Sequence, residues 1–237
     1  MKIQRIEQQP AFTLHTRAYE DNSLLVTLLT LEYGKISLIA YNTRSKKSSL
    51  RALLQPFYPL LISYNLKTSL GTLRKAEANG INYYLKAKSL LSALYLNELL
   101  IKLLPEQESC CELFNFYQKT LEKLLSISNP AKDLRIFEKY LLKDLGYEIN
   151  LLTTISQESI KPNLHYCYKF GHGFSETFST NHKTFAGQSL IALAKETLTT
   201  REELDDAKQL LRGVISFILG NRPLKSREFF HLPVNNS

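Results

Sequence analysis

The sequence lacks any hydrophobic stretch long enough to cross a membrane as a helix. Its longest run without a charged residue covers only the fifteen residues Ala52 to Leu66 and contains Pro56 and Pro59, whereas a membrane-spanning helix needs about 20 mostly apolar residues. The first ten residues, MKIQRIEQQP, carry three charges, and no apolar segment follows them, so we expect no secretory signal. We therefore expect a cytoplasmic protein with no membrane partner.

Signatures of catalysis and of metal binding are also missing. Three cysteines, Cys110, Cys111 and Cys167, cannot form a framework of paired disulfides, so we expect reduced thiols. The patterns GxxxxGK[ST], HExxH, GxSxG and CxxC do not occur, and the nine glycines are scattered. The acidic cluster from Glu202 to Asp206 begins a helical pattern, where carboxylates interact favourably with the helix dipole. We therefore expect no enzyme, no catalytic residue and no cofactor.

Positive charge is concentrated in the first third of the 237 residues, whose total formal charge is +8. Residues 1–80 hold eleven basic and five acidic side chains, a net charge of +6. Residues 81–150 are neutral, with nine of each, and residues 151–237 hold ten basic and eight acidic ones, a net charge of +2. A basic excess in one small domain suits a polyphosphate partner, because each neutralised phosphate releases counterions. The same excess would also serve solubility.

Five short segments in the first 80 residues are rich in branched, aromatic and threonine side chains, which is typical of strands. They are Ala11–Thr16, Ser23–Leu31, Lys35–Tyr41, Phe57–Tyr64 and Gly71–Glu77. Apolar residues mostly alternate from Lys35 to Ala40, which predicts a sheet with one buried face. Five such strands predict a small closed or partly open barrel, because an open sheet of this size would expose two edges.

Helical periodicity begins after the barrel. The expected helices cover residues 85–104, 112–125, 131–145, 186–195 and a last amphipathic segment that starts near residue 200. Thr200 and Glu203 offer a capping box for the last helix, and Asn129 offers a cap before Pro130. The fold class is therefore an α+β multidomain protein, divided into residues 1–80, 81–149, 150–184 and 185–237. The third of these segments is expected to be an irregular or β-ribbon insert.

A polar loop between two expected strands, YNTRSKKSSLR, contains four cations. They are Arg44, Lys46, Lys47 and Arg51. Aromatic residues are near in sequence, namely Tyr33, Tyr41, Phe57 and Tyr58. Cations for phosphates and rings for bases favour a barrel that binds single-stranded nucleic acid. A solvated loop beside aromatic residues of the core is the alternative.

The insert contains His165, Cys167, His172 and His182, whose side chains are of the types that bind zinc. Their spacing matches no common zinc module, so we expect loop histidines and one small buried thiol, with no metal.

Five ordered segments make the chain resemble the RecO family of bacterial recombination mediators. They are AFTLHTRAYEDNSLLVTLLTLEYGKISLIAYNTRSKKSSLRALLQPFYPLLISY, LGTLRKAEA, LYLNELLIKLLP, RIFEKYLLKDLGYEINL and GNRPLKSREFF. The resemblance implies an N-terminal five-stranded OB-fold barrel, an all-α helical domain and an insert that is a four-cysteine zinc ribbon in many relatives. No CxxC pair follows Tyr147 here, so the ribbon is degenerate and zinc is expected to be absent.

The resemblance also implies a nucleoid-associated, non-enzymatic function. Family members bind single- and double-stranded DNA, anneal complementary strands, join RecR and help RecA replace single-strand binding protein. On this chain we expect the DNA contacts to be Arg17, Lys35, Arg44, Lys46, Lys47 and Arg51. Arg135, in LRIFE, matches a family arginine that belongs to the pocket for the C-terminal tail of single-strand binding protein. An i,i+3 pair with Glu138 is the alternative for this residue.

Two other classes of function remain open at this point. An RNA-binding OB-fold accessory factor would have the same barrel and the same charge. A nuclease would need clustered carboxylates or a metal in a cleft, and it ranks last.

Overall fold

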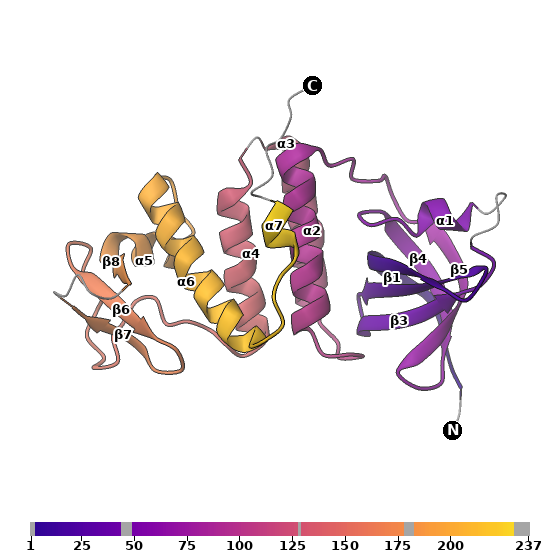
Figure 1. The fold of residues 1–237 in the computed structure, drawn as a ribbon, viewed down its shortest axis with the longest axis horizontal. Helices are drawn as coiled ribbons and strands as arrows, with labels where there is room; N and C mark the ends of the chain where they lie inside the picture. Colours follow the sequence, from indigo (N-terminus) through magenta and orange to yellow (C-terminus); the bar gives the residue numbers. More distant parts are fainter. Residues whose placement is uncertain (1–2, 44–48, 128, 178–182, 230–237) are drawn as a thin grey trace. The chain divides into compact units, whose positions relative to one another are not determined.

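The structure is a computed structural model, and it describes residues 3–43, 49–127, 129–177 and 183–229. The chain forms two compact units, and Figure 1 colours their elements in chain order. The first unit comprises residues 1–128 and 224–237, and the second comprises residues 129–223. None of the described helices is both long enough and apolar enough to span a membrane.

Five strands form a closed barrel in the first unit. They are β1 (Gln4–Tyr19), β2 (Ser23–Thr30), β3 (Gly34–Ala40), β4 (Pro59–Leu66) and β5 (Leu70–Ala78). Their order is β1-β2-β3-β5-β4, and β4 pairs with β1 to close the barrel. Only the β3–β5 pair is parallel. Irregularities in the register of the long strand β1, between Ile6 and Gln9 and between Thr13 and His15, accompany its pairing with two partners. The predicted five-stranded OB-fold barrel is thus confirmed.

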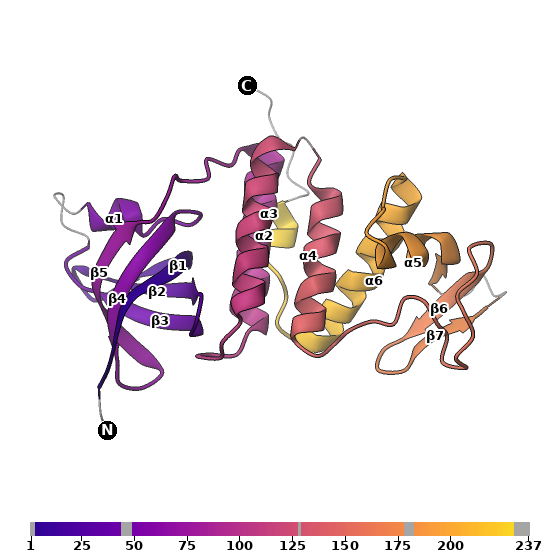
Figure 2. The same cartoon turned by 180° about the vertical axis from the view of Figure 1, so that it is seen from behind.

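Alternate residues of the strands fill the barrel, as period-two strands require. On β3 these are Ile36, Leu38 and Ala40. The prediction of a single buried face is wrong for this strand, because Lys35 and Ile39 on its outer side are buried as well. The short helix α1 (Leu50–Leu53) lies at one end of the barrel, as Figure 2 shows. Leu50 and Leu53 pack against the barrel core, which leaves the other side of α1 toward solvent.

Three helices belong to the same unit as the barrel. They are α2 (Ala87–Leu103), α3 (Cys111–Ser126) and the short α7 (Ser226–Phe229). A buried chain of hydrogen bonds joins α2 and α3 to β1: the Asn97 amide donates to the Leu14 carbonyl at 3.0 Å, and the Tyr117 hydroxyl donates to Asn97 Oδ1 at 2.6 Å. The ring of Phe12 lies 5.4 Å from those of Phe114 and Tyr117. The barrel and α2 and α3 therefore share one core.

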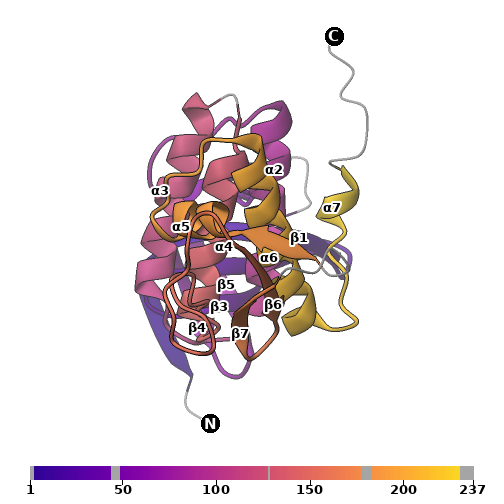
Figure 3. The ribbon, with the colours of Figure 1, turned by 90° about the vertical axis from the view of Figure 1, so that its left-hand side faces the viewer.

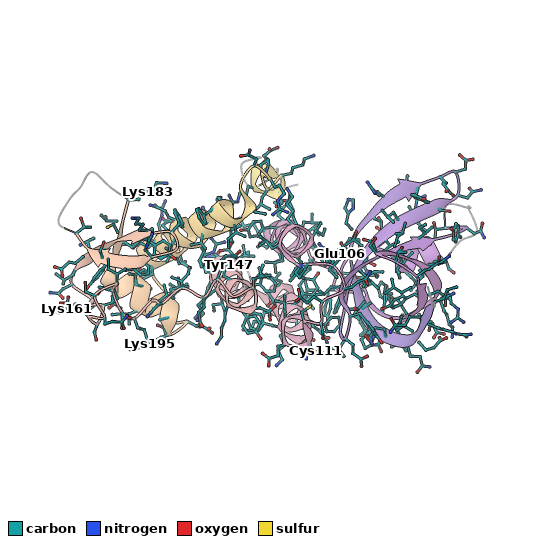
Figure 4. All side chains as sticks on the ribbon, turned by 90° about the horizontal axis from the view of Figure 1, so that it is seen from below. Glu106, Cys111, Tyr147, Lys161, Lys183 and Lys195 are labelled. Atoms are coloured by element: carbon teal, nitrogen blue, oxygen red, sulfur yellow. The ribbon has the colours of Figure 1, made fainter. Side chains whose placement is uncertain are left out.

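The segment between α2 and α3 lies against the barrel beside the start of β3. Gln107 donates its backbone N–H to the Lys35 carbonyl at 2.8 Å and its amide to the Thr68 carbonyl at 3.0 Å. A Cβ on Gly34, whose φ is +59°, would lie 1.8 Å from the Glu108 carbonyl oxygen, so only glycine allows this approach. Figure 4 labels Glu106 and Cys111 near the two ends of the segment. This contact covers the outer face of β3 at Lys35.

The second unit combines three helices with a small sheet. The helices are α4 (Ala131–Asp144), α5 (Gly187–Ala194) and α6 (Arg201–Leu219), and the strands are β6 (His165–Lys169), β7 (Gly173–Glu176) and β8 (Thr184–Ala186). The strands pair in the order β7-β6-β8, and α6 packs on α4, α5 and β8. Figure 3 has this sheet toward the viewer. The predicted capping box is present, because Thr200 Oγ1 accepts from the Glu203 N–H at 3.2 Å and Glu203 accepts from the Thr200 N–H at 3.0 Å.

The predicted elements agree with the structure apart from a few differences. Strand β1 begins at Gln4 rather than Ala11, and the short helices α1 and α7 were not expected. The insert forms a three-stranded sheet, in line with the β-ribbon alternative. Pro130 rather than Asn129 is the N-cap residue of α4, and Asn129 Oδ1 accepts from the N–H of the first helical residue, Ala131, at 3.2 Å. Helices α2, α3 and α7 group with the barrel, whereas α4, α5 and α6 form the second unit.

Candidate nucleic-acid interface

One end of the barrel carries an exposed cation and an exposed ring. Arg17 on β1 pairs in register with Leu25 on β2, and Leu25 pairs with Ile39 on β3. Tyr41 follows β3 directly, so the same end of the barrel presents both Arg17 and Tyr41. Arg17 is exposed and forms no ion pair with any residue that the structure describes, and Tyr41 is 49% exposed.

The segment after β3 is tied to this end of the barrel. The Thr43 N–H donates to the Asn22 carbonyl at 2.9 Å, which joins the segment to the turn between β1 and β2. On α1, Arg51 is exposed, because Leu50 and Leu53 take the side of the helix that faces the core. Arg51 likewise has no ion pair within the described ranges. The other three cations expected here, Arg44, Lys46 and Lys47, lie outside the described residues.

Lys35, another expected DNA contact, is buried, with 8% of its surface exposed. Its Nζ donates to the Ile101 carbonyl on α2 at 2.8 Å and lies 3.5 Å from Glu106 Oε1. Lys35 is also four residues along β3 from Ile39, or about 13 Å at the rise of a strand. The expectation of a DNA contact at Lys35 is therefore corrected, because its ammonium group is buried and bound to the Ile101 carbonyl and Glu106 within the first unit.

Acidic side chains neutralise the cations on another face of the barrel. Glu7 forms ion pairs with Arg5 and Arg74, and the hydrogen bonds from Arg5, Arg74 and Ser63 lower the pKa of Glu7 to about 2. Lys75 lies 2.8 Å from Glu77. Positive charge is thus partly compensated around Glu7 and Glu77, whereas Arg17 and Arg51 meet no carboxylate among the described residues.

The other aromatic residues near the basic loop are part of the barrel core. Phe57 is buried, and Tyr33 and Tyr58 pack against the core cluster. The Tyr33 ring meets that of buried Tyr64 edge-on, with 6.3 Å between ring centroids. Of the four rings that the sequence suggested, Tyr41 is therefore the most exposed, and Tyr33 and Tyr58 are half-buried.

Arg135 on α4 is only 4% exposed and does not project into solvent. Its Nη2 donates to Glu138 Oε1 at 2.8 Å, and Glu138 is fully buried. The i,i+3 pair is therefore present, and the expectation that an accessible Arg135 guanidinium meets a partner's carboxylate is corrected. Arg135 Nε and Nη1 have no hydrogen-bond partner among the described residues.

Two cations of α6 that sequence reasoning missed, Lys208 and Arg212, lie near Arg135. Partial burial lowers the pKa of Lys208, and the charges of Arg212 and Arg135 lower it further. The carboxylates of Asp205 and Glu138 oppose this lowering, so the cluster is mixed in charge, and Lys208 is its exposed cation. The i,i+4 spacing of Lys208 and Arg212 at the polar edge of an amphipathic helix was the available signal.

The insert brings no set of metal ligands together in the parts of the chain that are described. Cys167 on β6 pairs in register with Ser175 on β7, and its Sγ lies 3.1 Å from Ser175 Oγ. His165 and His172 are exposed, and His182 lies outside the described residues. The Cys167 thiol therefore takes part in a hydrogen bond within the sheet.

Comparison with known proteins gives two matches that together cover most of the chain. Residues 1–81 match the family described as "Recombination protein O N terminal", and residues 86–228 match "Recombination protein O C terminal". The DNA repair protein RecO of Coxiella burnetii is 39% identical over 229 residues, which cover 94% of this chain and 97% of that protein. RecO proteins of Vibrio parahaemolyticus and Vibrio cholerae are 38% and 37% identical, over 94% of this chain and 92% of each relative.

Proposed function

Because this chain belongs to the RecO family of recombination and DNA repair proteins, we propose that it binds single- and double-stranded DNA through its barrel and anneals complementary strands. With RecR it helps to load RecA onto DNA that is coated by single-strand binding protein. The protein acts without catalysis, at the nucleoid in the cytoplasm.

Base pairing itself supplies the free energy for annealing, so the protein has only to gather two strands that repel each other. Cations suit this task, because each phosphate contact releases counterions and weakens the repulsion. Contacts to phosphates alone also leave the base edges free to pair.

The observation that carries the proposal is the contrast between two faces of the barrel. Arg17 and Arg51 are exposed without an ion pair among the described residues, whereas Arg5 and Arg74 pair with Glu7. Exposed Tyr41 lies at the same end of the barrel as Arg17, where a ring and a cation can hold a base and its phosphate. Arg44, Lys46 and Lys47 add to this proposed DNA surface through their place in the sequence.

The test is the salt dependence of binding to a labelled single-stranded oligonucleotide. Substituting alanine for both Arg17 and Arg51 is expected to lower the slope of log K against log salt by about 1.4, at roughly 0.7 for each lost contact with single-stranded DNA. Arg74→Ala is the matched control, because it removes one barrel cation that Glu7 already neutralises. An unchanged slope in the double variant, or an equal fall per charge in the control, would contradict this DNA surface.

A competition between RNA and DNA of the same sequence separates DNA repair from an RNA-binding role. Preference for DNA, together with annealing of complementary strands, is the expected result. Preference for RNA would favour an OB-fold factor that acts on RNA instead.

The cluster of Lys208, Arg212 and Arg135 supports a contact with the acidic tail of single-strand binding protein. Lys208 presents an exposed ammonium group to a carboxylate, and Arg212 lies close to it on α6. We therefore propose that the tail of single-strand binding protein contacts the surface of α6. Buried Arg135 has a structural role, because it donates a hydrogen bond to Glu138.

A further inference from the structure

An aromatic groove with a volume of about 450 Å³ opens between the small sheet and α6 in the second unit. Phe170, which follows β6, and Phe217, on α6, stack with 5.4 Å between ring centroids and an interplanar angle of 6°. Tyr168 meets Phe170 edge-on at 5.4 Å. Phe217 is 63% exposed and Phe170 is 39% exposed, so the stack continues to the surface rather than into a core.

The helix makes room for this stack at Gly213. A Cβ at that position would lie 3.0 Å from Cζ of Phe170, closer than an ordinary contact. Glycine is otherwise unfavourable inside a helix. Its presence allows the edge of the Phe170 ring to approach α6 closely, next to Phe217.

The polar groups around the aromatic groove favour an anion. Lys183, which Figure 4 labels, lines the groove and is exposed, and among the described residues no carboxylate lines the groove. Asp206, the nearby acid of α6, is engaged by the Ala186 N–H at 3.0 Å. Gln209 adds an exposed side-chain amide that can donate and accept hydrogen bonds.

We propose that the aromatic groove binds a nucleobase of single-stranded DNA. The base stacks on the exposed Phe217 ring, and Lys183 meets a phosphate of the strand. This inference rests on the proposed DNA-binding function, and it adds a contact in a different unit from the barrel. An exposed ring and an ammonium group that line the same groove match a nucleotide, which has a flat face and a charge. An apolar side chain of a protein partner would use the rings and leave Lys183 unexplained.

The experiment uses the full chain and a single-stranded oligothymidine that carries one 5-iodouracil. Irradiation is expected to give a covalent adduct that mass spectrometry maps to Tyr168, Phe170 or Phe217. Phe217→Leu keeps the apolar bulk and removes the ring, so it is expected to weaken binding roughly fivefold, the lower end for one stacked base. The salt slope should stay unchanged in this variant, whereas Lys183→Ala should lower it by about 0.7.

Two further variants test whether weaker DNA binding by Phe217→Leu comes from a loss of folding or from the removal of any exposed ring. Phe217→Tyr restores stacking and is expected to bind like the unmodified protein. Tyr147→Leu removes another ring of the second unit, which is 50% exposed and outside the groove, and should leave affinity unchanged. Wild-type affinity in Phe217→Leu, with no adduct in the groove, overturns the inference and leaves barrel binding in place. Absence of DNA binding by the unmodified chain overturns both proposals.

Discussion

Replacing Lys35 with methionine distinguishes a structural role of this lysine from a role in DNA binding. Methionine keeps most of the apolar stem and removes the ammonium group, which donates to the Ile101 carbonyl at 2.8 Å and lies 3.5 Å from Glu106. Because Lys35 is buried, the structure predicts a loss of stability. A phosphate contact would instead predict weaker DNA binding with a smaller salt slope.

The expected loss follows from the two contacts. A hydrogen bond from a charged donor contributes about 1.5 to 3 kcal/mol, and an ion pair to an exposed carboxylate such as Glu106 adds at most about 1 kcal/mol. Removing the ammonium group also removes the free-energy cost of burying it, which offsets part of the loss from these two contacts. We therefore expect the free energy of unfolding to fall by about 2 kcal/mol, or about 4 to 8 °C in Tm for a chain of this length.

Urea denaturation and a salt series of DNA titrations measure both quantities on the same protein. Lys67→Met is the matched control, since Lys67 is an exposed lysine of the same barrel, and its unfolding free energy should change by less than about 0.5 kcal/mol. A smaller salt slope with unchanged stability in Lys35→Met would refute the structural role and restore Lys35 to the DNA surface.

Three further predictions concern charges elsewhere in the chain. The folded-state pKa of Glu7, about 2, lies below the ordinary value of 4.5, so its stabilising effect is present at neutral pH and is lost as the pH falls from about 4.5 towards 2. Glu7→Gln should therefore reduce the difference between the urea midpoints at pH 6 and pH 3, and an undiminished difference would contradict the ion pairs. Lys208→Ala should weaken binding of a peptide that copies the acidic tail of single-strand binding protein and spare DNA binding. Arg135→Ala should lower stability by about 3 to 5 kcal/mol, because it removes the guanidinium that pairs with the buried Glu138 carboxylate, and a normal Tm would contradict this.

Local patterns were sufficient to predict most of the secondary structure. The strands and helices follow from alternation, helical periodicity and caps, which act over a few residues, so β2 and β3 were predicted to within one residue at each end. The short helix α1 was missed, because four residues carry too little periodicity and its stability comes from Leu50 and Leu53 against the barrel. The stacked Phe170 and Phe217 were also missed, since 47 positions of the printed sequence separate them.

The sequence alone determined the family, the barrel followed by helices, and the excess of positive charge in the first 80 residues. Only the tertiary structure decided which of the described cations are available to a partner. Arg17 and Lys35 cannot be told apart by charge or propensity, yet one is exposed while the other meets the Ile101 carbonyl, which is 66 residues away along the chain. Long charged side chains are placed by distant neighbours that bury them or neutralise them, and such neighbours are defined by folding rather than by local sequence.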